Sequence, residues 1–274
     1  MPIRFRRAEV LAVRETGERW QVVEVRVLPR PGGPPSDDEV ALAFCETDLL
    51  GPLAPGDVVV VNTSARRLEL GTGGLDFVYW VEGRLPPDPP LGRQYGHLMK
   101  LRYTPLQRPT LSVEDGPSPL RSAYLRQERA GLGGRPLVVL GLHSQLPGVV
   151  AGIRSVSTAP IAFVQNTAGA LPASFSRLLR ELRSRSLLAL VVTAGHAYGG
   201  DLEAVSPASG LLAAAAAGAR VIIAGPGPGI AGTGTRYGTS ALEQLEFLHI
   251  GAALTATPVL CLRLSAADRR PRHN

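Results

Sequence analysis

Lysine is nearly absent from this sequence, since Lys100 is the single lysine among 29 basic residues. Cysteine is scarce as well, and Cys45 and Cys261 stand in different halves of the chain, without a CxxC or other metal-ligand spacing. Two isolated cysteines exclude a disulfide-rich secreted fold. We therefore expect two buried free thiols in a reducing compartment, the cytoplasm, and this spacing identifies no metal-ligand residues.

Long apolar runs are missing too. The longest, Leu211 to Ala217, is far shorter than the roughly 20 residues that a membrane span needs. Residues 1–15 contain arginines but no unbroken apolar core and no small-residue cleavage site, so we expect no signal peptide. The chain is 45% hydrophobic and 19% charged, which is typical of a globular protein rather than a disordered one. The sequence thus predicts a globular protein without a membrane partner.

The net charge of +6 is unevenly distributed along the chain. Residues 1–130 hold 17 basic and 17 acidic side chains, so the whole excess falls in residues 131–274. A β-barrel that binds RNA should itself carry a basic surface, and the N-terminal part does not. Basic and aromatic residues are also not interleaved. We therefore do not expect a nucleic-acid partner; an anionic small molecule is the alternative to a simple solvated surface. The helix expected to carry part of the excess holds Arg177, Arg180, Arg183 and Arg185.

Lys100 is a candidate functional residue because it is solitary. A sequence this rich in arginine suggests that arginine has replaced lysine wherever either residue serves. A lysine retained in such a sequence is a candidate for a role that needs a compact ammonium, or an amine whose pKa is lowered by burial. Chance retention is the alternative, and the sequence leaves both open.

Residues 1–115 are predicted to form a small β-barrel or sandwich. Short alternating strands are separated by glycine and proline, and the first two are joined by a hairpin at Thr16 to Glu18. A connector and then a helix over Ser118 to Ala130 follow, so we place the domain boundary near residue 115. The six expected strand segments span residues 5–15, 19–29, 38–46, 56–65, 75–83 and 96–104.

Residues 116–274 are predicted to form a Rossmann-like α/β domain. Five uninterrupted apolar runs alternate with helix candidates, a pattern typical of parallel strands that are buried on both faces. The strand order cannot be derived from this pattern. The expected strands are Pro136–Leu142, Ala159–Val164, Leu187–Thr193, Ala219–Ala224 and Pro258–Leu264, and the expected helices are Pro147–Val156, Pro172–Arg185, Pro207–Ala217 and Ala241–Leu254.

Polar residues follow each of these strands. Because ligands of such sheets bind beyond the carboxyl ends of the strands, we expect these residues to share one neighbourhood. His143 and His196 each end a strand and are candidates for a general base or metal ligand, with Asp201 or Asn166 as the orienting group. The alternative is that each histidine is a structural hydrogen-bonding residue. Further polar positions of this edge are Ser144, Ser265 and Asp268.

A glycine-rich loop after the fourth expected strand is the sharpest motif. Gly227, Gly229 and Gly232 form a GxGxxG, and such a backbone approaches an anion closely. Ser240 to Glu243 reads as a capping box that opens the next helix. The loop departs from a dinucleotide fingerprint because it follows the fourth strand, its helix starts late and no acidic residue follows at the expected distance. A purely structural glycine turn stays open. Donors to an anion would be Thr233, Thr235 and Arg236.

Three long segments resemble an uncharacterised bacterial family, a domain of unknown function. They read YGHLMKLRYTPLQ, TAGHAYGGDLEAVSPASGLLAA and GPGPGIAGTGTRYGTSALEQ. The resemblance implies one protein architecture over most of the chain and no particular activity or cofactor. It also implies that relatives continue beyond the segment SAADRRPRHN.

Two hypotheses for the function follow from these residues. The first is an enzyme that holds a phosphorylated or otherwise anionic metabolite, such as a nucleotide, at the glycine-rich loop, with His196 or His143 as base and Lys100 reaching in from the β domain. The second is a non-catalytic ligand-binding or scaffold protein that uses the same loop. Homo-oligomer formation is compatible with either.

Overall fold

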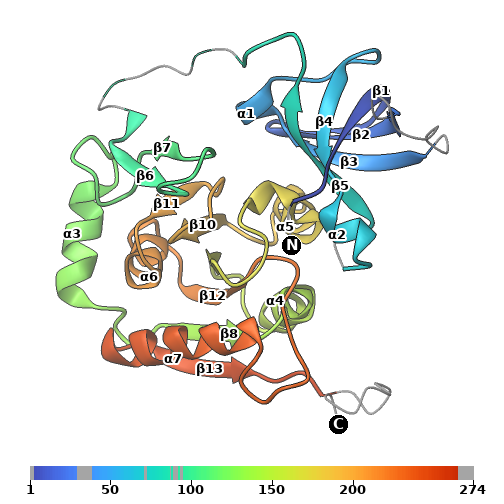
Figure 1. The fold of residues 1–274 in the computed structure, drawn as a ribbon. Coiled ribbons are helices and arrows are strands. Elements are labelled where there is room, and N and C mark those ends of the chain that lie inside the picture. The colour runs from blue at the N-terminus through green and yellow to red at the C-terminus, as the bar shows by residue number, and fades with distance from the viewer. Residues whose placement is uncertain are drawn as a thin grey trace. The chain divides into compact units, whose positions relative to one another are not determined.

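The computed structural model describes residues 3–29, 39–70, 73–86, 88, 92 and 95–264. It divides into two compact units, residues 1–89 and 90–274 (Figure 1). Our boundary near residue 115 differs from this division over residues 90–115. The strand expected there, β6 (Leu98–Lys100), is not part of the N-terminal barrel, because it pairs with β7 (Arg108–Thr110) in a separate two-stranded sheet. Ser265 and Asp268 lie outside the described residues.

The N-terminal unit is a closed five-stranded barrel in the order β1-β2-β3-β5-β4, which confirms the expected small β domain. The predicted hairpin joins the first two strands. Inward-facing valines such as Val10, Val25 and Val59 are at most 1% exposed and fill the barrel. Its elements are β1 (Phe5–Thr16), β2 (Trp20–Val27), β3 (Val40–Glu46), α1 (Thr47–Leu50), β4 (Val58–Asn62), α2 (Ser64–Arg67) and β5 (Leu75–Val81).

The second unit is built on a six-stranded, wholly parallel sheet in the order β11-β10-β9-β12-β8-β13. Five of these strands correspond to the five expected apolar runs. The sixth, β11, lies within what the sequence presented as a polar loop. The strands are β8 (Pro136–Leu140), β9 (Ile161–Asn166), β10 (Leu190–Ala194), β11 (Leu202–Ala204), β12 (Val221–Pro226) and β13 (Thr257–Cys261).

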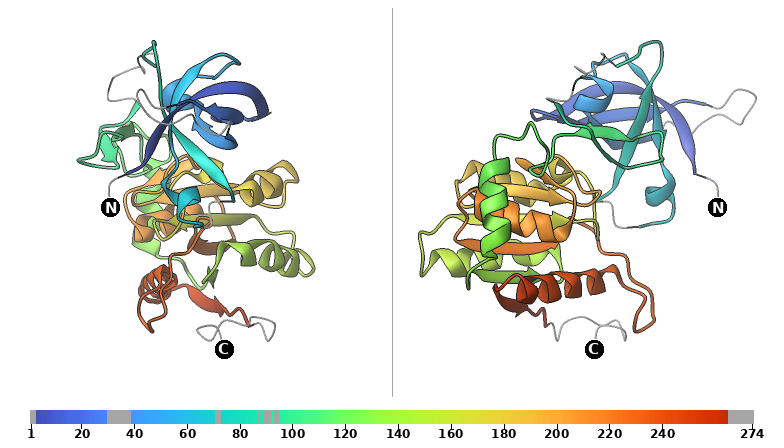
Figure 2. Two further views of the ribbon diagram at one scale, coloured as in Figure 1. Left: turned by 45° about the vertical axis from the view of Figure 1, so that its right-hand side comes forward. Right: turned by 90° about the vertical axis from the view of Figure 1, so that its left-hand side faces the viewer.

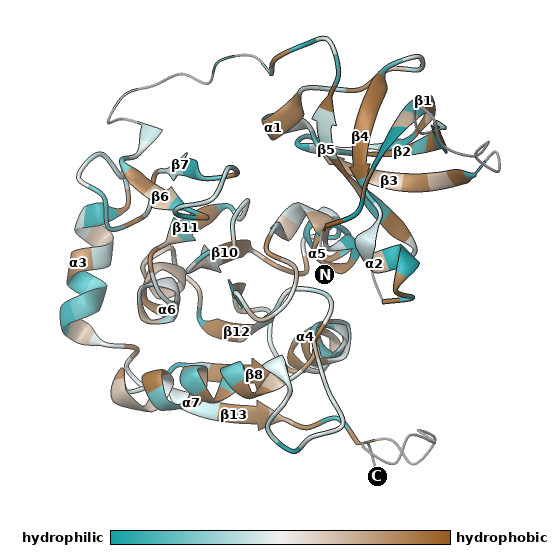
Figure 3. Ribbon diagram, viewed as in Figure 1, coloured by the Kyte–Doolittle hydropathy of each residue, from teal (hydrophilic) through white to brown (hydrophobic). Residues whose placement is uncertain are grey.

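Helices cover both faces of this sheet, as a Rossmann-like arrangement requires (Figures 1 and 2). One apolar cluster packs three helices on one face, and a second packs two helices on the other. Figure 3 shows β8 and β12 as largely hydrophobic, whereas α3 carries hydrophilic residues on its outer side. The first group is α3 (Arg121–Ala130), α6 (Pro207–Ala216) and α7 (Gln244–Ala253), and the second is α4 (Leu146–Arg154) and α5 (Arg177–Ser184).

Helix α6 packs on the sheet through small residues. At Gly210 there is no room for a side chain, since a Cβ added there would lie 3.0 Å from the Val164 side chain and 3.2 Å from that of Ala194. The remaining inner positions are alanines and leucines that are almost fully buried. This close packing fixes the carboxyl ends of β9 and β10, from which the loops of the candidate site begin.

The switch point of the sheet lies between β9 and β12, whose connections lead to opposite sides. The loops that follow these two strands contact each other beyond the strand ends, where the Ala170 N–H donates to the Pro228 carbonyl at 2.8 Å. A Cβ on Gly227 would lie 2.2 Å from the Ala170 carbonyl oxygen, so only glycine fits there. The backbone therefore occupies the place where a Rossmann-like fold usually binds its ligand.

The expected capping box at Ser240 and Glu243 does not open α7. These residues form a short 3₁₀ turn, η4 (Ser240–Glu243), and the α-helix begins after it at Gln244. The Ser240 hydroxyl donates instead to the Ala168 carbonyl and accepts from the Ala231 N–H. Ser240 thus joins the two loops of the switch point rather than capping a helix.

Candidate functional site

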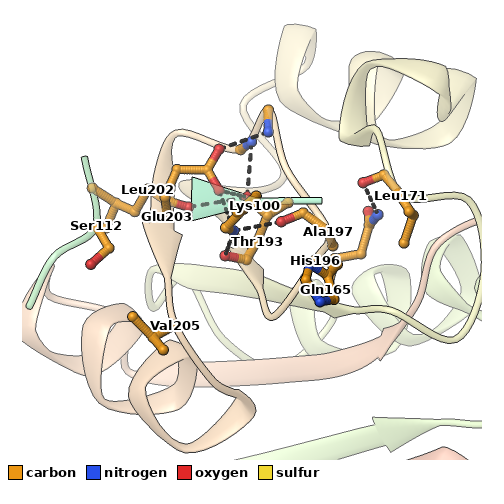
Figure 4. A network of polar contacts seen from close by, with 12 residues as sticks. Lys100, Ser112, Gln165, Leu171, Thr193, His196, Ala197, Leu202, Glu203 and Val205 are labelled. Carbon is orange, nitrogen blue, oxygen red and sulfur yellow. Dashed lines mark hydrogen bonds and ion pairs between the residues drawn. The ribbon is translucent and has the colours of Figure 1, made fainter. Parts of the chain in front are cut away.

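Lys100 is buried in the second unit at the end of β6, with 5% of its surface exposed. Its ammonium donates to the Thr193 carbonyl at 3.0 Å, to the Ala197 carbonyl at 2.5 Å and to Glu203 Oε2 at 2.5 Å (Figure 4). Burial lowers the pKa of Lys100, and the charge of Glu203 opposes that shift. Each of the three N–H groups of the Lys100 ammonium thus has its own acceptor.

Glu203 completes this network from β11. Its Oε2 also accepts from the Thr193 hydroxyl at 2.7 Å, and its Oε1 accepts from the Gly199 N–H at 2.7 Å. The loop between β10 and β11 has to turn tightly to do this. Gly199 has a φ of +80°, and a Cβ on Gly200 would lie 2.8 Å from the Val191 carbonyl oxygen. The two consecutive glycines therefore allow the loop to enclose the ion pair.

His196 stands on the same loop, and the backbone of Leu101 orients it. The Leu101 N–H donates to His196 Nδ1 at 3.1 Å. An Nδ1 that accepts this bond leaves the proton of the neutral ring on Nε2. Leu101 has a φ of +49°, a conformation that leucine rarely adopts, in the turn that presents its N–H to the ring. His196 therefore presents an N–H donor rather than a free base.

A pocket of about 70 Å³ lies beside this network. Every ionisable residue that lines it is basic, namely Lys100, Arg102 and His196. The exposed Arg102 has no ion pair or hydrogen bond with any residue that the structure describes. The Ser112 side chain is buried, and its hydroxyl has no partner in the same described part of the chain. The other lining residues are Leu98, Met99, Thr110, Gly195, Ala204 and Val205.

The carboxylates of this neighbourhood are not part of the pocket lining. Glu203 is bonded to Lys100, and Glu114 Oε1 accepts from the Val205 N–H at 3.0 Å. Asp115 accepts from the Ser112 N–H and lies 2.9 Å from His97 Nδ1. The ionisable residues of the pocket lining are therefore all basic, although several acidic side chains lie near the pocket.

The other candidate histidine, His143, is sealed at the switch point. Its Nδ1 lies 2.8 Å from the Pro226 carbonyl oxygen, which can only accept, so Nδ1 carries the proton. Its Nε2 accepts from the Ser176 hydroxyl at 2.6 Å. Burial lowers the pKa of His143, and the bond to Pro226 opposes this weakly. Both ring nitrogens are occupied within the protein, and none is left for a substrate.

Asp201 does not orient His196, contrary to expectation. It lies beside the amino end of β10, whereas His196 follows the carboxyl end of that strand. Its Oδ2 accepts from the Val191 N–H at 2.7 Å, and its Oδ1 pairs with Arg183 at 2.8 Å. Strand β11 runs parallel to β10 and begins at Leu202, directly after Asp201. Asp201 therefore lies near the amino end of β10.

Asn166 and Ser144 lie at the carboxyl ends of their strands, as expected, but not in the pocket. Asn166 is 2% exposed, and its Oδ1 accepts from the Ala168 N–H at 3.2 Å, which stabilises its own loop. Ser144 is exposed in the 3₁₀ turn η2 (His143–Gln145). Neither residue belongs to the pocket lining.

The glycine-rich loop forms hydrogen bonds within itself. The hydroxyls of Thr233 and Thr235 lie 2.8 Å apart, and the Thr233 N–H donates to the Gly238 carbonyl at 2.7 Å. Arg236 is exposed, with its guanidinium carbon 5.5 Å from the ring centre of Tyr237. No residue from Gly227 to Tyr237 lines the Lys100 pocket. Gly227 is buried against the neighbouring loop, while Gly229 and Gly232 are exposed.

Two arginines of α5 and Arg185 at its C-terminal cap bond to other groups at the protein surface. Arg180 donates to the Ser174 carbonyl, Arg183 pairs with Asp201, and Arg185 pairs with Glu181 at 2.7 Å. Among the described residues, no cluster of three or more His, Cys, Asp or Glu side chains is arranged to hold a metal ion.

Fold and site together define a two-part protein, a small closed β-barrel joined to a parallel α/β unit whose basic pocket lies beside a buried Lys–Glu pair. The chain belongs to a family described as "Protein of unknown function (DUF3866)", whose model matches residues 42–274, so the expected membership of a family of unknown function is confirmed. The searches of curated proteins and of solved structures gave no match. No described helix is long and apolar enough to cross a membrane.

Proposed function

We propose that this protein binds a small organic anion in the pocket beside Lys100, through Arg102 and His196. The observation that carries the proposal is the basic lining of the pocket together with an Arg102 guanidinium that has no partner in the described part of the chain. Arginine is the side chain best suited to carboxylates and phosphates, because its planar fork donates two parallel hydrogen bonds.

Lys100 supports the site as a positioning residue rather than as the group that meets the ligand. All three of its donors are directed to Thr193, Ala197 and Glu203. The planar guanidinium of arginine would not match three acceptors that surround a single nitrogen atom. This is a physical reason for a lysine at this position, although all other Lys/Arg positions of the chain are arginine. Through these bonds Lys100 holds the loop that carries His196.

His196 supplies the second contact to the anion. With Nδ1 occupied by Leu101, the ring donates from Nε2 to an oxygen of the ligand. A neutral imidazole donor of this kind also polarises a carbonyl group, which is the specific observation in favour of a second candidate function, an enzyme that acts on the bound anion. Ligand binding without catalysis requires the same contacts. We propose the cytoplasm as the location, since Cys45 and Cys261 are both free.

The glycine-rich loop is the competing anion site, and a pair of arginine variants separates the two. Arg102→Gln removes the guanidinium at the pocket, and Arg236→Gln makes the same change in the loop. Isothermal titration of the full chain with a panel of small carboxylates and inorganic phosphate, at constant ionic strength, should show saturable binding to wild type and to Arg236→Gln and at least about tenfold weaker binding to Arg102→Gln. The reverse pattern would place the anion at the loop and contradict the proposal.

A further inference from the structure

We infer that the ligand of the Lys100 pocket is a short-chain monocarboxylate rather than a phosphate ester or a nucleotide. This inference rests on the proposed function and names the chemical class of its ligand. Three properties of the pocket carry it: its size, the apolar part of its wall, and the number and kind of the donors that are still unused.

Size excludes the large ligands. The pocket holds about 70 Å³, whereas pockets for drug-sized ligands measure about 300–1,000 Å³. The pocket is therefore several times smaller than the pockets that hold ligands of that size. A nucleotide or a sugar phosphate does not fit into this volume, and a carboxylate with a short tail does.

Part of the pocket wall is apolar. Leu98, Met99, Ala204 and Val205 line the pocket together with the three basic side chains. A ligand that fills this space therefore needs an uncharged, largely apolar body attached to its anionic group. Inorganic phosphate has no such body and would leave the apolar wall in contact with water.

The unused donors match a monoanion. Arg102 provides one guanidinium fork, His196 one N–H and Ser112 one hydroxyl without a partner among the described residues, which together satisfy the two oxygens of a carboxylate. Phosphate sites usually add backbone N–H groups at the start of a helix. Helix α6 begins at Pro207, two residues after the lining residue Val205. The N–H groups of Ser206 and Ser209 at this helix start are already used, since the Ser206 hydroxyl accepts from the Ser209 N–H and the Ser209 hydroxyl accepts from the Ser206 N–H in a closed capping box. A phosphate carries more oxygens and more charge than a carboxylate, so the same donors would serve it less completely.

The pocket lining also suggests which residue limits the chain length of the ligand. Met99 is 38% exposed and lines the pocket, whereas Leu106, equally exposed in the following turn, does not. Met99→Ala enlarges the apolar end and should shift the preference towards acids one or two carbons longer. Leu106→Ala is the matched control, and it should leave the order of affinities unchanged.

The test is isothermal titration of the full chain with propionate, butyrate, 2-oxobutyrate, inorganic phosphate and adenosine monophosphate at constant ionic strength. We expect saturable binding of the three carboxylates, at least about tenfold weaker binding of each to Arg102→Gln, and a change of chain-length preference in Met99→Ala only. Stronger binding of phosphate or the nucleotide, lost in Arg102→Gln, would overturn this inference and leave the proposed anion site intact. Absence of binding by all five anions up to 10 mM, about ten-thousandfold above a micromolar dissociation constant, would overturn both.

Discussion

His143 and His196 follow two strands of the same sheet, yet their surroundings differ in the one respect that matters for binding. His143 donates to Pro226 from Nδ1 and accepts from Ser176 at Nε2, so its ring is fully used by the fold. His196 accepts from Leu101 at Nδ1 and keeps its Nε2–H for a pocket. A histidine at a strand end is therefore a functional candidate only where the surrounding backbone leaves one nitrogen unoccupied.

The same contrast separates the two anion sites that were considered. The glycine-rich loop satisfies its threonine hydroxyls and part of its backbone within itself. The Lys100 pocket satisfies the buried ammonium completely and leaves the groups at its surface free. A buried hydrogen-bond network that holds unused donors in position is the arrangement expected of a ligand-binding site.

The largest effect is expected from the buried ion pair. Lys100→Met leaves Glu203 without its cation, and breaking a buried pair in this way lowers the free energy of unfolding by about 3–5 kcal/mol. Arg185→Met breaks the exposed pair with Glu181 and should change it by less than about 1 kcal/mol. Urea denaturation measures both. The double variant of Lys100→Met and Glu203→Gln should regain part of the loss, and a Lys100→Met protein as stable as wild type would contradict the structural role of the pair.

The three glycines of the GxGxxG should differ in a defined order. Gly227→Ala places a Cβ 2.2 Å from a backbone oxygen and should cost about 1–3 kcal/mol as an overpacked substitution. Gly229→Ala has free space but a φ of +83°, which costs about 1–2 kcal/mol. Gly232→Ala meets only the Thr239 hydroxyl at 3.9 Å and should be near neutral. Equal losses at all three positions, measured by thermal unfolding, would contradict these individual packing roles.

The sealed histidine predicts a pH dependence of stability. Burial depresses the pKa of His143 in the folded state below the ordinary value of about 6.5, so the unfolded chain binds the proton first. The contribution of His143 is complete above pH 6.5 and is lost as the pH falls through that value towards the depressed pKa, by at most about 1.4 kcal/mol per pH unit. Unfolding free energies between pH 5 and 8 should show a smaller slope in His143→Asn than in wild type, and equal slopes would refute this account.

Much of the fold could be predicted because the signals were local. Apolar, β-branched runs specified five strands of the parallel sheet, and alternating residues with a glycine turn specified the first hairpin of the barrel. Strand β11 was missed because it has only three residues, one of them Glu203, and its pairing with β10 depends on tertiary contacts. The pairing of β6 with β7 likewise joins residues that no periodicity connects.

The candidate site could be predicted only in part, for a related reason. Lys100 and His196 were found from a compositional anomaly and a strand end, and the structure brings them together through Leu101 and Ala197. Those two contacts use backbone atoms, which every residue type has, so the sequence gives no sign of them. The role given to Asp201 was wrong because nearness in sequence was taken for nearness in space across a strand that the sequence did not show.

The most direct test is a nitrogen-15 NMR spectrum of the histidine rings, recorded before and after addition of 2-oxobutyrate. The two histidines should be neutral and of opposite tautomer, with the proton on Nδ1 in His143 and on Nε2 in His196. We predict that the ligand shifts the His196 Nε2 resonance and leaves both His143 resonances in place, and that Arg102→Gln abolishes the shift. A response at His143, or binding that leaves His196 unperturbed, would contradict the assignment of the pocket.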